Sequence, residues 1–480
     1  MERKNPKCSQ YDLRALEAWL AEMAADGWEL AGEWPYFDQT EQPQERCFAI
    51  EPAAEKDGVP KALLDSRATM GWEYVCAIDK GALSWQYTPI KSLGIERRNT
   101  MFIYADNAAT TKLSRKALDA MLSCLEEKYG NPSGIHSMGQ RASAALYDAR
   151  ERMAMALGCK PAELTFTSGG SEADNQAIVS AARLGEKLGK KHIVSTTIEH
   201  HAVLHTLKRL EREGFEVTLL PVAPVTGRVT PQQVADAIRD DTALVTVMYA
   251  NNEIGTIEPI AEIGAVCRER GVIFHTDAVQ AVGHLPIRIS DENIDMLALS
   301  AHKFGGPKGV GVLFARKGIN LTSLIEGGAQ ERGKRAGTEN VPGIAGMAAA
   351  LEEAVKNVEK DTAHLLPLRD KLIAGLQKIP RSMCNGDLVN RLPGNVNFCF
   401  EGVEGETLLL LLDGMGICAS SGSACASGSL DPSHVLLAIG RSHAEALGSL
   451  RLSLGADVTE AEIDYLIQSV TDAAAKLRGI

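Results

Sequence analysis

The sequence lacks the cysteine spacings that mark metal sites and redox motifs. Its ten cysteines are scattered, and no two of them form a Cys-x-x-Cys pair, so neither a zinc site nor a thioredoxin-like motif is indicated. A chain of 480 residues with dispersed cysteines is typical of a reducing compartment. We therefore expect a cytoplasmic protein with no metal site.

Long apolar runs and an excess of basic residues are also missing. The longest leucine run, residues 408–412, is far too short to span a bilayer. The charged residues 1–7 are not followed by the apolar segment of a signal peptide. The net charge of −12 argues against nucleic acid as a partner, because such binding relies on basic patches that neutralise phosphates. These absences predict a protein without a membrane or nucleic-acid partner.

The sequence does contain enough apolar residues for large cores. Hydrophobic residues make up 45% and charged residues 23% of the chain, a balance typical of globular proteins. Its length of 480 residues predicts about three domains. All five tryptophans lie before residue 98, so this first stretch differs in composition from the rest.

The first 98 residues contain two similar units, each with a helical pattern, a glycine and an aromatic strand. They run through residues 16–30 and 62–75, and Trp28 and Trp72 open the strands. This pattern resembles a small bacterial domain of unknown function, and we expect its tryptophans in a core rather than in a ligand site. We predict an accessory α+β domain at residues 1–98, whose partner is unknown, fused through a linker to a second protein.

Residues 114–345 alternate helical patterns with short apolar runs. Such runs suit strands that are buried on both faces of a mainly parallel sheet, which places ligands at the carboxyl ends of its strands. After residue 345, long helices with few strands predict a second, smaller domain. The predicted strands are residues 164–167, 192–195, 217–220, 243–248, 272–276, 296–299, 310–314, 394–400 and 450–454, and the predicted helices include residues 140–157, 231–239, 260–270, 342–358 and 365–377.

Lys303 follows the apolar run of residues 295–299 and lies in a glycine-rich segment at residues 300–309. A lysine that is desolvated at the end of a buried strand can lose basicity and act as a nucleophile toward carbonyls. A single lysine in a turn is more often a solvated loop residue. The choice between these interpretations depends on what the other strand ends carry.

Four other polar clusters follow predicted strands. Residues 167–175 place a glycine turn before a helix start, which can serve as an anion cradle or only as a helix cap. Residues 199–201 hold a histidine pair that could stack on a ring or lie on the surface, and residues 251–256 form a polar turn. Asp277 ends a buried strand, where an acid needs a cationic partner such as a protonated ring nitrogen. A phosphate cradle, an acid, a histidine and a lysine together indicate pyridoxal phosphate.

From Tyr104 to its C-terminus the sequence resembles the cysteine desulfurases, a family of pyridoxal phosphate enzymes with the aspartate-aminotransferase-like α/β fold. The resemblance implies a large cofactor-binding domain at residues 114–345 and a smaller α+β domain made of residues 101–113 and 346–480. The matching motifs lie at residues 106–111, 130–136, 167–175, 199–201, 251–255, 277–280, 300–309 and 335–340.

The same resemblance implies roles around the cofactor ring. Lys303 would bond to the cofactor aldehyde and later move protons. Asp277 would hold the ring nitrogen, and His200 would stack on the ring and assist proton transfer. Gln280 and Asn252 would lie by the ring hydroxyl.

It also implies how the phosphate and the substrate are held. Thr338 would reach the phosphate bound by the partner subunit, so a homodimer with shared active sites is expected. Arg451, beside Asn252, would bind the carboxylate of L-cysteine through its planar donor fork. The phosphate would be held within the subunit by Gly170, Ser171, Ser300 and His302.

Cys425 lies in a stretch of small residues and glycines, residues 418–429, that gives it freedom to swing. In the family this cysteine attacks the substrate sulfur, forms a persulfide and leaves alanine. The other interpretation is a buried structural cysteine, as we expect for Cys399 and Cys418. The loop resembles the desulfurases that pass sulfur to a separate scaffold or carrier protein, for iron–sulfur cluster assembly or another pathway.

Two other functions remain open. The chain could be an aminotransferase or a selenocysteine lyase of the same fold, in which Cys425 is not needed. It could also be an adaptor in which a degenerate desulfurase serves as a binding module beside the N-terminal domain. The presence of every expected catalytic residue favours the desulfurase.

Overall fold

The computed structural model describes residues 101–421 and 432–479, together with the backbone of five strands within residues 1–100. The chain divides into two compact units, Met1–Thr100 and Met101–Ile480. None of the helices in these described residues is long and apolar enough to cross a membrane.

The first unit contains two small antiparallel sheets. Strand β1 (Trp28–Leu30) pairs with β2 (Phe37–Gln39). In the second sheet β5 (Ala82–Tyr87) lies between β3 (Cys47–Pro52) and β4 (Trp72–Ile78). Strands therefore begin at Trp28 and Trp72, as the sequence predicts, whereas the helices expected before them lie outside the described residues.

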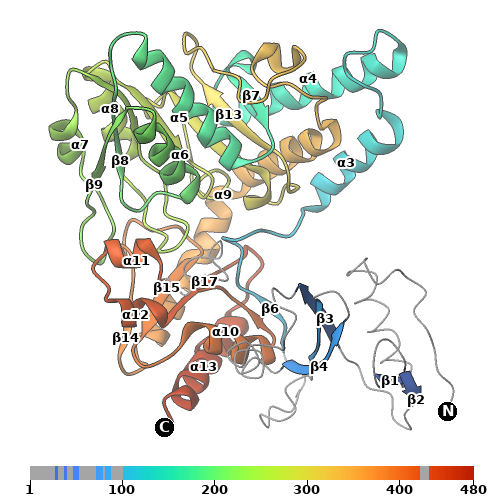
Figure 1. The fold of residues 1–480 in the computed structure, drawn as a ribbon, viewed down its shortest axis with the longest axis vertical. Helices are drawn as coiled ribbons and strands as arrows, with labels where there is room; N and C mark the ends of the chain where they lie inside the picture. The colour runs from blue at the N-terminus through green and yellow to red at the C-terminus, as the bar shows by residue number, and fades with distance from the viewer. Residues whose placement is uncertain are drawn as a thin grey trace. The chain divides into compact units, whose positions relative to one another are not determined.

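The second unit is built on a seven-stranded sheet (Figure 1) with the order β7-β13-β12-β11-β10-β8-β9. All neighbouring strands are parallel except at β13, which is antiparallel to both β12 and β7. The prediction of a mainly parallel sheet is confirmed. The strands are β7 (Leu164–Thr167), β8 (His192–Thr196), β9 (Glu216–Leu220), β10 (Thr242–Thr246), β11 (Ile273–Asp277), β12 (Met296–Ser300) and β13 (Gly311–Ala315).

Alternating side chains bury this sheet on both faces. Ile193, Leu244 and Met296 pack with helices α5 and α6 on one face, and their neighbours Val194 and Val245 pack with α4, α8 and α9 on the other. A strand that is buried on both faces needs apolar residues throughout, which explains the continuous apolar runs. The helices of this layer are α3 (Arg115–Glu127), α4 (Ser137–Leu157), α5 (Gly170–Glu186), α6 (His201–Arg212), α7 (Pro231–Ala237), α8 (Ile260–Glu269) and α9 (Val341–Leu376).

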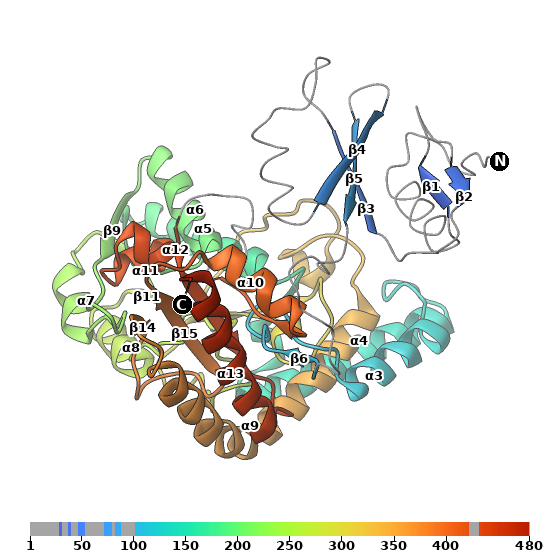
Figure 2. The ribbon, with the colours of Figure 1, turned by 90° about the horizontal axis from the view of Figure 1, so that it is seen from below.

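The C-terminal part of the same unit holds two smaller sheets and packs helices around them (Figure 2). One sheet has the order β14-β15-β17, and the other pairs β16 with β6 from the start of the unit. Residues far apart in the chain therefore meet in this part. Its elements are β6 (Ile103–Tyr104), β14 (Ser382–Cys384), β15 (Asn395–Phe400), β16 (Ile417–Cys418), β17 (Ser449–Ser453), α10 (Gly405–Gly414), α11 (His434–Ala438), α12 (His443–Leu447) and α13 (Glu460–Leu477).

Helix α9 corrects one prediction. We expected two helices, 342–358 and 365–377, but the structure has one helix of 36 residues that continues through Pro367. Val358 and Leu365 are both buried, and residues seven apart lie on the same face of a helix. The polar residues between them are the solvent side of one helix, so their polarity did not mark a loop.

Candidate active site

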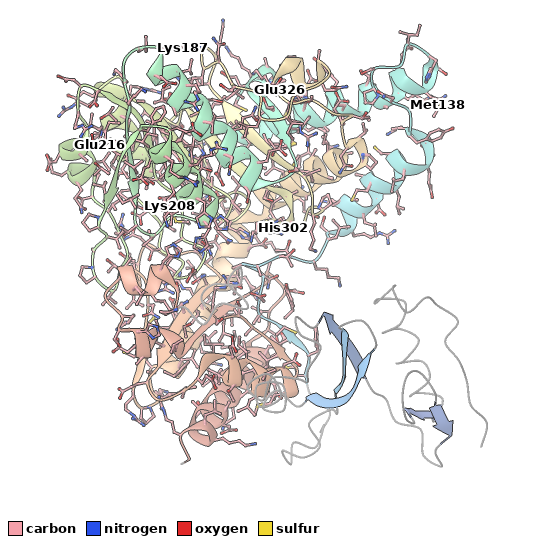
Figure 3. The ribbon with its side chains drawn as sticks, viewed as in Figure 1. Met138, Lys187, Lys208, Glu216, His302 and Glu326 are labelled. Atoms are coloured by element: carbon pink, nitrogen blue, oxygen red, sulfur yellow. The ribbon has the colours of Figure 1, made fainter. Side chains whose placement is uncertain are left out.

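The predicted site residues gather at the carboxyl ends of the large sheet. Asp277 and Ser300 are the last residues of β11 and β12, and Lys303 ends a short 3-10 turn, Ala301–Lys303, that follows β12. His200 follows β8 and caps α6. His302, which is labelled in Figure 3, lies where this sheet meets the C-terminal part of the unit.

Lys303 and Gln280 converge on one backbone carbonyl. The Lys303 Nζ donates to Ala108 O at 2.6 Å and to Ala109 O at 2.9 Å, and Gln280 Nε2 donates to Ala108 O at 2.9 Å. The carbonyl is held in place because Ala108 N donates to Ser453 Oγ at 2.9 Å. A strand of the C-terminal part thus helps to position the amine.

Asp277 supplies a buried acid next to this amine. It is 5% exposed, and its Oδ1 accepts from Val279 N at 2.9 Å. Burial raises the pKa of the Asp277 carboxyl, while His200, the N–H of Val279 and the charge of Lys303 act in the opposite direction. The three predicted residues therefore lie within electrostatic reach of one another.

The first turn of α5 forms a tight cradle. A Cβ on Gly170 would lie 2.5 Å from Val279 Cγ2 and 3.6 Å from Ser300 Cβ, so only glycine fits here without movement. The N–H groups of Gly170 and Ser171 precede the first intrahelical bond, from Ala173 N to Gly169 O, and N–H groups at this position of a helix can bind an anion. Ser171 and His200 line one cavity of about 380 Å³.

Two histidines of the site have defined ring environments. His200 Nδ1 accepts from Ala202 N at 3.1 Å, so its neutral ring carries the proton on Nε2. His302 Nδ1 lies 3.1 Å from Thr110 Oγ1, and burial, followed by the charges of Lys303 and Lys308, lowers the pKa of His302 to about 4. His302 is therefore a neutral polar group at physiological pH.

Arg451 and Asn252 meet at the other side of the site. Arg451 is 1% exposed; its Nη1 donates to Asn252 O at 3.0 Å and its Nη2 to Asp106 Oδ1 at 2.9 Å. The buried Nε has no hydrogen-bond partner among the described residues. Three of the five guanidinium N–H groups thus remain for a carboxylate.

Two predicted residues are not brought into this cluster. Thr338 is exposed and lines a separate cavity of about 190 Å³ with Ser168 and Arg335. Cys425 lies outside the described residues. The described ends of its segment are nevertheless anchored at the site, because Ser420 N donates to Arg451 O at 3.2 Å and Ser433 Oγ donates to the buried Glu253 carboxyl.

The two cysteines expected to be structural differ. Cys399 is buried, as predicted, and its sulfur accepts from Asn385 Nδ2 at 3.1 Å. Cys418 is only partly buried, because it lies in β16 of a two-stranded sheet that leaves one edge open. The prediction of a buried Cys418 is therefore wrong.

Some contacts of the site have no signal in the sequence. The carbonyls of Ala108 and Ala109 bind Lys303 through backbone atoms, which any residue supplies. Asp106 lies in one of the matching motifs, residues 106–111, so the sequence marked it as a candidate site residue. Its ion pair with Arg451 was not predicted.

The donors and acceptors present fit pyridoxal phosphate. A helix N-terminus without room for a side chain suits a phosphate, a buried carboxyl suits a protonated ring nitrogen, and a lysine amine suits the cofactor aldehyde. The orphaned Arg451 Nε adds a donor for a substrate carboxylate. Each feature follows from the described side chains alone.

Comparison with known proteins agrees with this geometry. Residues 103–466 match the family described as aminotransferase class-V. A cysteine desulfurase IscS from Methanosarcina thermophila is 52% identical over 378 residues, which cover 79% of this chain and 93% of the relative. One from Clostridium botulinum is 54% identical over 369 residues, 76% of this chain and 92% of the relative. The chain belongs to the cysteine desulfurase family.

Solved structures confirm the fold predicted for this desulfurase family member. A NifS-like protein superposes with a TM-score of 0.73 at 39% identity, covering 78% of this chain and all of the other. SspA, solved in complex with cysteine, gives a TM-score of 0.64 at 38% identity over 73% of this chain and 98% of the other. The family is dependent on pyridoxal 5′-phosphate, which is therefore the cofactor of this enzyme.

Proposed function

We propose that this chain converts L-cysteine to L-alanine, takes the sulfur onto Cys425 as a persulfide, and delivers it to a sulfur acceptor. The observation that carries the proposal is that Lys303 and Arg451 both bind the segment of residues 106–109, with Asp277 near Lys303. The described ends of the segment that bears Cys425 are bonded next to them. An amine, an acid and a guanidinium in this arrangement suit an amino-acid substrate. Roles for individual residues follow from it.

Lys303 moves the proton of the substrate carbon. Its amine is held by two carbonyls, which orient it without supplying a competing charge. Bound pyridoxal phosphate supplies the electron sink for the negative charge left on that carbon. Asp277 would hold the protonated ring nitrogen of the bound cofactor, and the Nε2–H of His200 would be available to donate a proton to the alanine fragment.

Arg451 orients the substrate through its carboxylate. Asp106 and the carbonyl of Asn252 fix the guanidinium plane from one side, and the remaining donors form the fork that a carboxylate accepts. SspA, one of the similar structures, is described as a complex with cysteine. We infer that L-cysteine binds here with its thiol directed toward the Cys425 segment.

Cys425 acts as the nucleophile. Its thiolate attacks the substrate sulfur, so that an S–S bond forms while the carbon–sulfur bond breaks, and the electron pair of that bond stays with the alanine fragment. A proton added to the β carbon, and the return of a proton to the α carbon by Lys303, complete alanine. A thiol or a scaffold protein then removes the outer sulfur and regenerates the Cys425 thiolate.

Replacement of two cysteines tests this function. Cys425→Ala should retain the bound cofactor and its colour but release no alanine or sulfide from L-cysteine, since no acceptor remains for the sulfur. Cys418→Ala, in the same C-terminal part, is the matched control and should form alanine at the wild-type rate. Sulfide release by Cys425→Ala at a rate near wild type would show that the persulfide step is wrong and would favour a lyase.

We also propose a homodimer in which Thr338 completes the phosphate site of the partner subunit. Several exposed apolar side chains on and around α3 and α4 support an interface, because association sites are commonly apolar surfaces. Mixing inactive Lys303→Ala with an inactive Thr338 variant should restore activity if the sites are shared, and no recovery would contradict it. The exposed side chains are Leu122, Leu125, Tyr129, Ile135, Tyr147 and Met155.

The domain assignment and the cellular setting are further parts of the proposal. We propose that residues 1–98 form an accessory domain that binds a partner, that the desulfurase domains are residues 114–345 and residues 101–113 with 346–480, and that the enzyme works in the cytoplasm. Six cysteines of the described part are all unpaired, as a reducing compartment requires. Deleting residues 1–98 should leave alanine formation intact and reduce sulfur transfer to the acceptor, and fractionation should place the protein in the cytoplasm.

A further inference from the structure

A second acid–base cluster lies behind Asp277 and has no part in the proposed chemistry. It consists of Asp174 on α5, His275 on β11 and Glu199 after β8, which are 1%, 0% and 0% exposed. Buried titratable groups are costly unless they are paired or neutral, so their charge state needs an explanation.

The strand geometry brings this cluster under Asp277. Residues two apart in a strand point to the same face, so His275 and Asp277 share the face of the sheet that α5 covers. His275 lies beside Thr246 of the neighbouring strand, and Thr246 Oγ1 is 2.9 Å from His275 Nδ1. On the other side of the ring, His275 Nε2 is 3.6 Å from Asp174 Oδ1.

The two atoms that face each other in the Asp174–His275 pair make no other hydrogen bond among the described residues. Asp174 Oδ1 and His275 Nε2 are both fully buried, and neither has a hydrogen-bond partner in the described part of the chain. Buried polar atoms in native proteins are nearly always bonded. The two atoms therefore belong together, either as an aspartate–imidazolium ion pair or as a neutral acid facing a neutral imidazole.

Electrostatics favours the neutral pair. Burial lowers the pKa of His275 to about 3. Burial, followed by the charges of Asp277 and Glu199, raises the pKa of Asp174 well above its usual value. Burial also raises the pKa of Glu199 to about 8. Burial raises the pKa of Asp277 as well, but the N–H of Val279 and the charge of Lys303 oppose that rise, so Asp277 is the one of these three carboxyls with the Lys303 cation beside it.

We propose that Asp174 is a positioning residue: as a neutral acid linked through His275 to Thr246, it fixes the β11 end and leaves Asp277 as the charged member of this group of buried carboxyls. The Asp174 proton faces His275 Nε2, and the Nδ1–H of the same ring donates to Thr246 Oγ1. The inference rests on the proposed role of Asp277 at the ring nitrogen. A negative charge on Asp174 would add to that of Asp277 and change the proton affinity of the ring nitrogen.

The charge state is tested in the cofactor-free protein. A folded-state pKa above the unfolded value means that the stability contributed by protonated Asp174 is present at low pH and is lost as pH rises from about 4 upward. Asp174→Asn copies the neutral acid, so its unfolding midpoint relative to wild type should rise between pH 5 and pH 8. If Asp174 and His275 form an ion pair instead, Asp174→Asn should be less stable than wild type throughout pH 5 to pH 8. That result would overturn the proposal that the pair is neutral.

Positioning is tested through cofactor binding. Asp174→Asn should keep the dissociation constant of pyridoxal phosphate within about threefold, and the pH midpoint of its absorption band within about 0.5, whereas Asp174→Ala should weaken binding about tenfold or more. If both variants bind pyridoxal phosphate with the same dissociation constant, Asp174 only fills space, and the positioning role is overturned. A band midpoint shifted by about one pH unit or more in Asp174→Asn would show that Asp174 is charged.

Two further variants separate this inference from the proposed function. Glu292→Gln removes another carboxyl whose pKa burial raises, but one that accepts from Arg288 N and has no part in the Asp174–His275 pair, and should leave the cofactor band unchanged. Asp277→Asn should shift it strongly. An unchanged band in Asp277→Asn would refute the proposed role of Asp277 and with it the positioning role of Asp174, while the unfolding comparison would still decide the charge of the pair.

Discussion

Lys303 and Gln280 donate hydrogen bonds to the same oxygen, the carbonyl of Ala108, at 2.6 and 2.9 Å. The oxygen belongs to a segment that Ser453 holds from the C-terminal part of the unit. Lys303, in the turn after β12, is therefore positioned by Ala108, which lies far earlier in the chain, and Ala108 is held in turn by Ser453, which lies far later. A shift between the two parts of the unit would move the amine.

The first prediction concerns this amine. Lys303→Ala should lose the colour of the bound cofactor and all measurable alanine formation, because the covalent link and the proton carrier are removed together. Lys308→Ala is the matched control, since Lys308 is an exposed lysine in the same glycine-rich segment. Absorption spectra and alanine assays measure both. A coloured, active Lys303→Ala protein would contradict the assignment.

The sequence predicted the strands well because burial on both faces leaves a strong signal. Strand β7 was predicted residue for residue at 164–167, and the carboxyl ends of the strands indeed carry Asp277 and Ser300. The prediction divided helix α9 into two helices because the residues between them are polar. A polar stretch in the sequence fits the exposed side of one helix as well as it fits a loop. Only packing distinguishes them, through Val358 and Leu365 on one buried face.

The sequence predicted which residues belong to the site, but it did not predict which atoms they would bind. The resemblance named Lys303 and Arg451, but the acceptors of Lys303 are backbone carbonyls, which carry no side-chain signature. The partner of Arg451 is Asp106, 345 positions away, and a single sequence offers no way to pair residues at that separation. Local patterns thus predict elements and motifs, whereas tertiary contacts decide the geometry.

The second prediction concerns substrate binding by Arg451. Arg451→Lys should raise the KM for L-cysteine roughly tenfold or more with a smaller change in kcat, because lysine cannot form the two-donor fork. Asp106→Asn should raise KM less, since it only loosens the guanidinium plane. Arg441→Lys serves as the control, because Arg441 bonds Asn385 and Cys384 instead. A fall in kcat without a change in KM would contradict a role in binding the carboxylate.

The third prediction uses the tight cradle at the start of α5. Gly170→Ala places a Cβ 2.5 Å from Val279 Cγ2, so the helix start must move and the dissociation constant of pyridoxal phosphate should rise about tenfold. Val279→Ala alone should bind the cofactor nearly as wild type does. The double variant has room for the new methyl group and should recover most of the affinity. Affinity that stays low in the double variant would mean that the loss has another cause than this contact.

The fourth prediction concerns pH and a buried acid outside the site. Burial raises the pKa of Glu258 to about 8, against the opposing N–H of Val229 and the charge of Arg228. Because this folded-state pKa exceeds the unfolded value of about 4.3, stability from the protonated acid is full below pH 4 and declines as pH rises toward 8.

Glu258→Gln keeps an oxygen that can accept from Val229 N, as Glu258 Oε2 does at 2.9 Å, but it cannot ionise. Its free energy of unfolding should therefore lie closest to wild type near pH 5 and exceed it by about 2–4 kcal/mol near pH 8, where the wild-type acid ionises on unfolding and so favours the unfolded state. Denaturant titrations at the two pH values measure the difference. Glu262→Gln, an exposed acid on α8, should show no such dependence. A Glu258→Gln protein that is less stable at pH 8 would mean that the carboxyl is charged and paired in the fold.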